Sequence, residues 1–171
     1  PFPAQPLQLL STRIKPDDAW GLTFWDRGHC HAAIAALRNE GIFTPLAEQP
    51  TLLFPGSLGG ANWGGGAYSP QTQRLIVNVN AAPFVAQLIR GAAAGTKQDH
   101  PVAGQKTMHV TMQGTPYTLA VGPLLSPLGI PCTAPPWGKL VAVDLAQGRV
   151  AWEVPLGSVH EMGPFPLPWH I

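Results

Sequence analysis

Residues 142–157 read AVDLAQGRVAWEVPLG, and this stretch is the most informative about the fold. Its pattern is A-x-D-x-x-x-G-x-x-x-W-x-x-x-x-G. Asp144 suits a tight turn, where its carboxylate can accept hydrogen bonds from backbone N–H groups, and Gly148 suits a position with positive φ. Trp152 follows on the next strand, where its indole can fill the space between stacked sheets. The stretch therefore predicts two strands joined by a tight turn, with a tryptophan that serves packing.

The composition extends this picture to the whole chain. The 171 residues include 19 Gly and 20 Pro, while 11% of residues are charged and 45% are hydrophobic. Low charge with ample apolar content argues against disorder. Frequent Gly and Pro exclude a helical bundle, because both residues break helix interiors. The composition thus predicts a mainly β fold of short strands and many turns.

Short strand-like runs recur along the chain, about ten residues apart, as expected for an all-β architecture. The run at 84–89 fits either a strand or a single helical turn. Small and polar residues at 91–107 predict a long surface loop. The predicted strands cover 51–54, 64–68, 74–79, 109–112, 117–121, 139–144 and 150–154.

One helix is predicted, over residues 27–39 near the N-terminus. Its apolar side chains Cys30, Ile34 and Leu37 recur at i, i+4 and i+7, and several alanines between them have high helix propensity. Asp26 precedes this run and is the candidate N-cap.

Charge excludes several kinds of partner. The formal net charge is +1, and the chain contains no run of like charges, so it lacks the basic footprint of a nucleic-acid-binding protein. No window approaches the roughly 18 apolar residues that a transmembrane helix needs. Because the chain opens at Pro1 and stops at Ile171 without a charged tail, we expect a piece of a longer protein.

Cys30 and Cys132 are far apart in the sequence, and two cysteines alone cannot form a zinc site. In an oxidising compartment they can pair, and closing so long a loop contributes roughly 4 to 5 kcal/mol in the chain-entropy model. Two separate buried thiols fit the sequence equally well. His29 and His31 do not suggest a metal site, because a helix separates such a pair by about 200°.

Residues 51–68 read TLLFPGSLGGANWGGGAY and place Trp63 among glycines. Small neighbours such as Gly64 and Gly65 let a flat ligand approach the backbone and stack on an exposed indole. The segment is not a phosphate loop, because the strand–turn–helix context of that motif is missing. Taken alone, Trp63 would more often be a packing residue.

The A-x-D…G…W pattern resembles the tryptophan-docking motif of the eight-bladed propellers that bind pyrroloquinoline quinone (PQQ). Together with the segments at 38–45, 51–68 and 123–138, it makes the chain similar to the membrane-bound quinone-dependent glucose dehydrogenases of bacteria. The resemblance runs from about residue 16 to 168. It implies two to three blades of such a propeller. The motif also fits propellers with no catalytic activity.

The resemblance implies a cofactor site. Trp63 corresponds to the floor under the quinone, with Gly64 and Gly65 beside it. Asn80 corresponds to an oxygen ligand of the Ca²⁺ or Mg²⁺ that holds the quinone, and Asn78 is the other candidate. Hard cations prefer such carboxamide and carboxylate oxygens. The structural alternative is that these asparagines tie a loop to the backbone.

Two departures from the family concern catalysis. The glucose enzymes carry a lysine that contacts the quinone carbonyl where this chain has Thr133, which supplies no positive charge. The family's general base, an aspartate, corresponds to the region 103–108, which contains no carboxylate. Asp99 is the nearest acid and a weak candidate for the base. The substrate then differs from glucose, the acid comes from elsewhere, or the site is degenerate.

The resemblance divides the chain into a cofactor-floor blade at 41–90, a variable loop at 91–113 and a blade with the docking motif at 114–157. It implies a periplasmic dehydrogenase of a sugar, polyol or other alcohol, with ubiquinone or a cytochrome as electron acceptor. The alternative is a non-catalytic propeller that binds proteins. An incomplete propeller also exposes strand edges that a second copy of the chain can cover.

Overall fold

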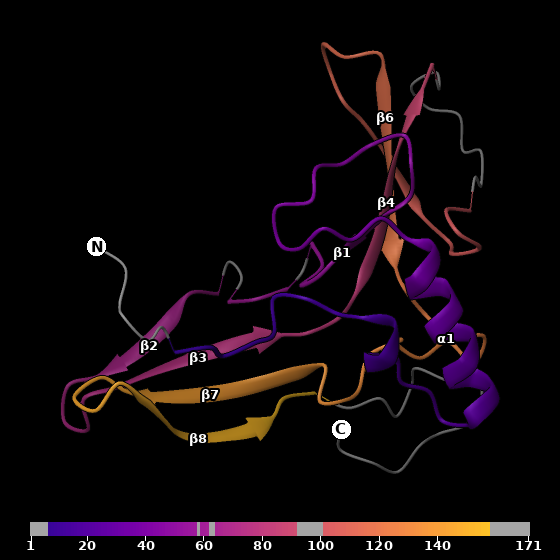
Figure 1. Ribbon diagram of the computed structural model, residues 1–171. Coiled ribbons are helices and arrows are strands. Elements are labelled where there is room, and N and C mark those ends of the chain that lie inside the picture. Colours follow the sequence, from indigo (N-terminus) through magenta and orange to yellow (C-terminus); the bar gives the residue numbers. More distant parts are fainter. Residues whose placement is uncertain (1–6, 58, 62–63, 92–100, 158–171) are drawn as a thin grey trace.

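The computed structural model describes residues 7–57, 59–61, 64–91 and 101–157. It contains two four-stranded antiparallel sheets, one α-helix and one short 3₁₀ helix (Figure 1). The mainly β fold with one helix near the N-terminus is therefore confirmed. No helix in the described parts of the chain has the length and apolar character needed to cross a membrane.

The elements follow one another with short connections, apart from the segments between α1 and β1, β1 and β2, β4 and β5, and β6 and β7. In chain order they are η1 (Pro16–Asp18), α1 (Phe24–Ala36), β1 (Thr51–Leu53), β2 (Gly66–Ser69), β3 (Arg74–Asn80), β4 (Phe84–Arg90), β5 (Met108–Thr111), β6 (Tyr117–Pro123), β7 (Gly138–Asp144) and β8 (Arg149–Pro155).

The first sheet has the strand order β2-β3-β7-β8 and contains the stretch that is the most informative about the fold. The turn between β7 and β8 forms as predicted. Asp144 Oδ1 accepts hydrogen bonds from Ala146 N at 3.0 Å and Gln147 N at 2.9 Å. Gly148 has φ +62°. Trp152 on β8 lies opposite Ala142 on β7 and is half-buried.

Replacing Asp144 by alanine is expected to destabilise this turn by about 1 kcal/mol, because two backbone N–H groups lose their acceptor. Asp144→Asn keeps an acceptor oxygen at the same place and is the matched control, with little expected change. Urea unfolding of both variants measures the difference. Equal loss of stability in the two variants would show that the carboxylate charge, rather than the acceptor, stabilises the turn.

The second sheet has the order β1-β4-β6-β5 and arises from an excursion of the chain between two neighbouring strands of the first. The chain leaves β3, forms β4, β5 and β6, and returns to pair β7 along the full length of β3 (Figure 1). The run at 84–89 is thus a strand. Each sheet takes strands from both 41–90 and 114–157, and the division of the chain into blades stays a prediction.

Each sheet buries its own apolar cluster. Helix α1 packs against the second sheet, and its inward side chains Cys30 and Ile34 join Leu52 of β1 and Val85 of β4. In the first sheet the buried side chains are valines of β3 and β7. Leu9 and Leu10 of the N-terminal segment pack against those valines.

The predicted helix boundaries are wrong by three residues at each end. Helix α1 begins at Phe24, with Thr23 as N-cap, and its Oγ1 accepts a hydrogen bond from Asp26 N. Threonine and aspartate both favour the N-cap, so local sequence did not separate them. The helix ends at Ala36 because Arg38 pairs with the strand region instead: Arg38 N donates to Pro50 O, and Leu52 N donates to Arg38 O.

Most described residues of the predicted surface loop at 91–107 are exposed, as expected, but two of its side chains are buried. Val102 is 1% exposed and Gln105 is 9% exposed. Gln105 Nε2 donates to Leu125 O, and Leu125 N donates to Gln105 Oε1, both at 3.0 Å. The two hydrogen bonds resemble the paired backbone hydrogen bonds of neighbouring strands. They attach the segment around Gln105 to the loop that follows β6.

Candidate functional site

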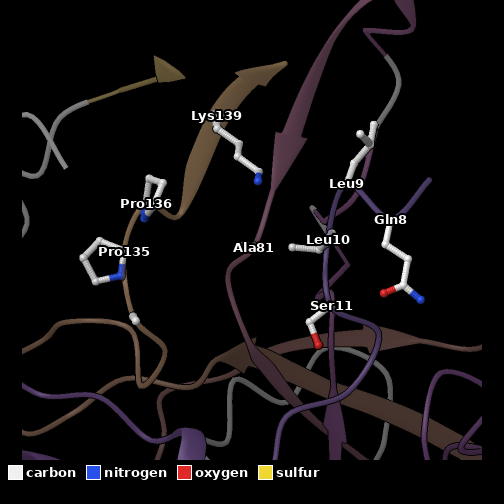
Figure 2. A pocket seen from close by; sticks show the side chains of 9 residues that line it. Gln8, Leu9, Leu10, Ser11, Ala81, Pro135, Pro136 and Lys139 are labelled. Carbon is white, nitrogen blue, oxygen red and sulfur yellow. The ribbon is translucent and has the colours of Figure 1, made fainter. Parts of the chain in front are cut away.

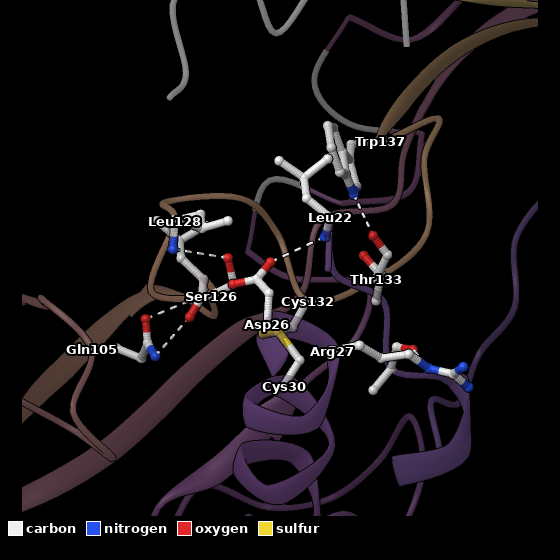
Figure 3. Close-up of a disulfide and its surroundings, with 12 residues drawn as sticks. Leu22, Asp26, Arg27, Cys30, Gln105, Ser126, Leu128, Cys132, Thr133 and Trp137 are labelled. Carbon is white, nitrogen blue, oxygen red and sulfur yellow. Dashed lines mark hydrogen bonds between the residues drawn. A yellow bond between two sulfur atoms is a disulfide. The ribbon is translucent and has the colours of Figure 1, made fainter. Parts of the chain in front are cut away.

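Cys30 and Cys132 form a disulfide, with their Cα atoms 5.2 Å apart and 102 positions between them in the sequence. Both residues are fully buried. The bond joins α1 to the proline-rich loop between β6 and β7 (Figure 3). Of the two alternatives that the sequence left open, the structure has the paired one.

Backbone and indole contacts hold the end of this loop, next to the disulfide. Trp20 N donates to Cys132 O at 3.0 Å, and Trp137 Nε1 donates to Thr133 O at 2.7 Å (Figure 3). The rings of Trp20 and Trp137 meet edge to face, with centroids 5.7 Å apart. Such contacts fix the position of Thr133 from both sides.

Thr133 lies beside the connection between β3 and β4. It is 8% exposed, and its Oγ1 donates to Ala81 O at 3.4 Å. Ala81 directly follows Asn80, so the structure brings together the predicted quinone-lining residue and the region of the predicted metal ligands. The hydroxyl of Thr133 supplies no charge there, and its role toward a quinone stays a prediction.

Asn80 is the last residue of β3 and pairs with the glycine-rich segment. Gly60 N donates to Asn80 O at 2.9 Å, and Asn80 N donates to Gly60 O at 3.1 Å. Asn78 lies two residues earlier, on the same face of β3, and is exposed. The two predicted ligands therefore share a face of β3, and the backbone of Asn80 lies beside Gly60 of the glycine-rich segment.

Gly64 and Gly65 are exposed, and a Cβ added to either would meet no atom within 4 Å. Gly65 also has φ +61°, a conformation that favours glycine. A side chain at either position would therefore meet no described neighbour. Trp63, the predicted floor of the quinone site, lies outside the described residues, and its role stays a prediction.

The side-chain oxygens of Asn78 and Asn80 are of the type that Ca²⁺ or Mg²⁺ prefers, but two oxygens are too few to complete the coordination of either cation. Two carboxamide oxygens from Asn78 and Asn80 suit Ca²⁺, which takes six to eight oxygen ligands. Among the described residues, no three His, Cys, Asp or Glu side chains gather where they could hold a metal. A full coordination shell therefore needs donors from other parts of the protein or from the ligand itself.

The described residues 103–108, where the resemblance led us to expect the base, contain no carboxylate. Asp99 lies outside the described residues. Gln105 stands in the corresponding region, and both ends of its carboxamide are bound to Leu125, as described above. The carboxamide of Gln105 thus fastens this segment to the loop after β6.

Sequence reasoning missed one buried acid, Asp26. Its side chain is fully buried, Oδ2 accepts a hydrogen bond from Leu22 N at 3.1 Å, and Oδ1 has no partner among the described residues. Asp26 stands one helical turn before Cys30, which places it beside the disulfide (Figure 3). The available signal was the i, i+4 spacing between Asp26 and the buried Cys30, but the sequence favours Asp26 as an N-cap.

The resolved pKa shifts belong to exposed ion pairs. The hydrogen bond from Arg38 lowers the pKa of Glu40, and the hydrogen bond to Glu48 raises the pKa of Arg90. Both shifts favour the charged forms, as expected for paired guanidinium and carboxylate groups. These pairs stabilise loops and do not mark a catalytic acid or base.

Comparison with known proteins decides the family. The family model described as glucose/ethanol/alcohol dehydrogenase, beta-propeller domain (PQQ), matches residues 1–171. The chain belongs to this family. The two four-stranded antiparallel sheets fit part of its propeller. Both the resemblance to quinoprotein glucose dehydrogenases and the partial-propeller fold are therefore confirmed.

The relatives are dehydrogenases with different substrates in their names. The chain is 40% identical over 171 residues to the quinoprotein glucose dehydrogenase of Escherichia coli, covering 96% of this chain and 22% of that protein. It is 36% identical over 179 residues to a probable quinate dehydrogenase (quinone) of Xanthomonas campestris pv. juglandis, covering 99% and 22%. It is 32% identical over 166 residues to the glycerol dehydrogenase large subunit of Gluconobacter thailandicus, covering 91% and 22%.

The chain thus spans about a fifth of the length of these relatives. No solved structure matches it.

Proposed function

We propose that this chain forms one side of the cofactor and substrate site of a PQQ-dependent dehydrogenase that oxidises a sugar, polyol or other alcohol. The observation that supports this most is the meeting of three segments at the end of β3. Thr133 contacts Ala81, and Asn80 pairs with Gly60. Residues far apart in the sequence but matching the family's cofactor contacts thus become neighbours.

In the proposed site, Trp63 forms the floor under the quinone, and Gly64 and Gly65 clear the space above it. Asn80, or Asn78 on the same face, donates an oxygen to Ca²⁺ or Mg²⁺. The quinone, when bound, supplies a two-electron acceptor for hydride.

Oxidation of the alcohol also requires a base, because its carbon loses hydride while its hydroxyl loses a proton. Asp99 is the candidate in this chain, and the remaining part of the protein is the other source of a carboxylate. Thr133 would line one wall of the quinone site, and because its hydroxyl carries no charge, other groups would have to stabilise negative charge that develops on a bound quinone. We expect a lower rate of quinone reduction than a lysine at this position would support.

Ubiquinone or a cytochrome would accept the electrons. We place the protein in the periplasm, because a disulfide such as that between Cys30 and Cys132 is stable in an oxidising compartment. The edge strands of the two sheets are β2 and β8, and β1 and β5. In the isolated chain, a second copy can cover these edges.

The second candidate is a non-catalytic propeller that binds other proteins. Thr133 in place of lysine and the structural use of Gln105 favour it. The sequence pattern of Trp63 among glycines, followed by Asn78 and Asn80, favours the enzyme, because a protein-binding scaffold has no need of that combination.

Reconstitution of the full-length protein with PQQ and Ca²⁺ separates the two functions. We expect quenching of tryptophan fluorescence on quinone addition, and dye reduction with at least one aldose, polyol or alcohol. Trp63→Ala is expected to abolish both. Trp25→Ala removes an exposed tryptophan on α1, away from the proposed site, and is expected to preserve both. Absence of quenching and of dye reduction in the unaltered protein would overturn the dehydrogenase proposal.

A further inference from the structure

Trp137 forms hydrogen bonds with both of the segments that meet at the end of β3. Its indole Nε1 donates to Thr133 O at 2.7 Å, and its own carbonyl oxygen accepts a hydrogen bond from Ala81 N, also at 2.7 Å. Thr133 is the predicted quinone-lining residue, and Ala81 directly follows Asn80, the predicted metal ligand. One residue therefore holds the first segment with its side chain and the second with its backbone.

The residue after Trp137 lies close to the side chain of Asn80. Gly138 pairs with Asn80 in the register of β3 and β7, and a Cβ added to Gly138 would lie 3.5 Å from Asn80 Oδ1. The oxygen proposed as a metal ligand is thus near the backbone that leaves Trp137. A displacement of Trp137 would therefore change the position of Asn80 relative to Thr133.

The indole of Trp137 is held in an apolar cluster of its own. Trp137 is 9% exposed and packs with the buried Ile130, and three partly buried side chains cover the pair, namely Trp20, Leu22 and Leu128. This cluster is separate from the two clusters of the sheets. Because a closely packed ring keeps one orientation, the direction of the indole N–H is fixed.

Few other contacts fix the distance between the two segments. The direct hydrogen bond from Thr133 Oγ1 to Ala81 O measures 3.4 Å, which is long for a hydroxyl donor. The two hydrogen bonds of Trp137 are shorter, at 2.7 Å each, so they contribute more to the positions of the segments.

The same segments border a cavity of about 340 Å³ between the N-terminal segment and the start of β7 (Figure 2). Its lining includes Ala81, Ala134, Pro135 and Pro136, together with Lys139. Atoms that face a cavity lack packing partners on that side. Packing therefore restrains these segments less firmly here, which increases the importance of the hydrogen bonds of Trp137.

We propose that Trp137 is a positioning residue that holds the quinone-lining segment and the metal-ligand segment at the separation that the bound cofactor needs. This inference rests on the proposed function. Trp137 acts through Thr133 and Ala81. A site that is ordered before its ligand arrives binds more tightly, because less conformational freedom is lost on binding.

Calorimetric titration of the full-length protein with PQQ in the presence of Ca²⁺ tests the proposal. Trp137→Phe keeps an aromatic ring and removes the N–H donor, and we expect it to weaken PQQ binding about tenfold. Trp20→Phe is the matched control, because its ring packs edge to face on Trp137 but its indole donates no hydrogen bond among the described residues. We expect this control to leave PQQ binding unchanged.

Hydrogen exchange of the cofactor-free protein provides a second readout that does not depend on PQQ. In Trp137→Phe, the backbone amides of residues 79–84 are expected to exchange severalfold faster, because the amide of Ala81 donates to the carbonyl of Trp137. Trp20→Phe is expected to leave exchange in this segment unchanged. Circular dichroism at the temperature of the titration checks that both variants are folded.

PQQ affinity that Trp137→Phe leaves unchanged, or that Trp20→Phe lowers equally, would overturn the inference. Unchanged exchange at 79–84 in Trp137→Phe would overturn it as well, because the indole would then not control the segment that follows β3. The proposed function fails by a different result, namely no binding of PQQ to the unaltered protein.

Discussion

Replacing Cys30 and Cys132 together by alanine is expected to lower the free energy of unfolding by about 4 to 5 kcal/mol. The bond closes a loop over 102 positions, and a loop of that length removes about this much chain entropy from the unfolded state. Both sulfurs lie in the core between α1 and the loop before β7. Guanidinium unfolding monitored by circular dichroism measures the loss.

Reduction provides the control for this prediction. Dithiothreitol is expected to lower the stability of the unaltered protein and to leave the stability of the double variant unchanged. Because alanine also leaves a small cavity in the core, the double variant is expected to be somewhat less stable than the reduced protein. If dithiothreitol left the free energy of unfolding of the unaltered protein unchanged, the disulfide would not be stabilising.

The second large effect is expected from Gly122→Ala, which should lower the free energy of unfolding by about 3 kcal/mol. Gly122 is a buried residue of β6, and a Cβ at this position would lie 2.2 Å from Lys106 O. The opposing atom is backbone, so it cannot turn away as a side chain can. The segment at 105–107 must then shift, which strains the pair between Gln105 and Leu125.

Gly28→Ala is the matched control, with the opposite expected sign. Gly28 is exposed on α1, and a Cβ there would meet no atom within 4 Å. Alanine is favoured over glycine in helix interiors by about 1 kcal/mol, so this variant should be more stable than the unaltered protein. Chemical unfolding of the two variants side by side measures both effects, and a neutral Gly122→Ala would show that the segment at 105–107 yields easily.

Both predictions depend on contacts between segments that are distant in the sequence. Neither the partner of Cys30 nor the atom that faces Gly122 follows from local patterns. The position of Gln105 is similar, because its small polar neighbours predict an exposed loop, whereas its two hydrogen bonds to Leu125 fasten it to the fold. Burial at such a position depends on tertiary partners, which override local composition.

The sequence by itself determined the family, the mainly β class, the helix near the N-terminus and the hairpin of β7 and β8. These features depend on neighbouring residues: Asp144 and Gly148 make their turn within five positions of each other. The predicted cofactor residues were also named from sequence, by resemblance to the family.

Only the tertiary structure decided that β3 pairs with β7, that Cys30 joins Cys132, and that Thr133 lies against Ala81. It also places Lys139 at the edge of a cavity, which the local sequence does not indicate for a single lysine in a strand. The physical reason is the same in each case. Sequence patterns report which face of an element is apolar, but the pairing of distant segments depends on how whole elements pack.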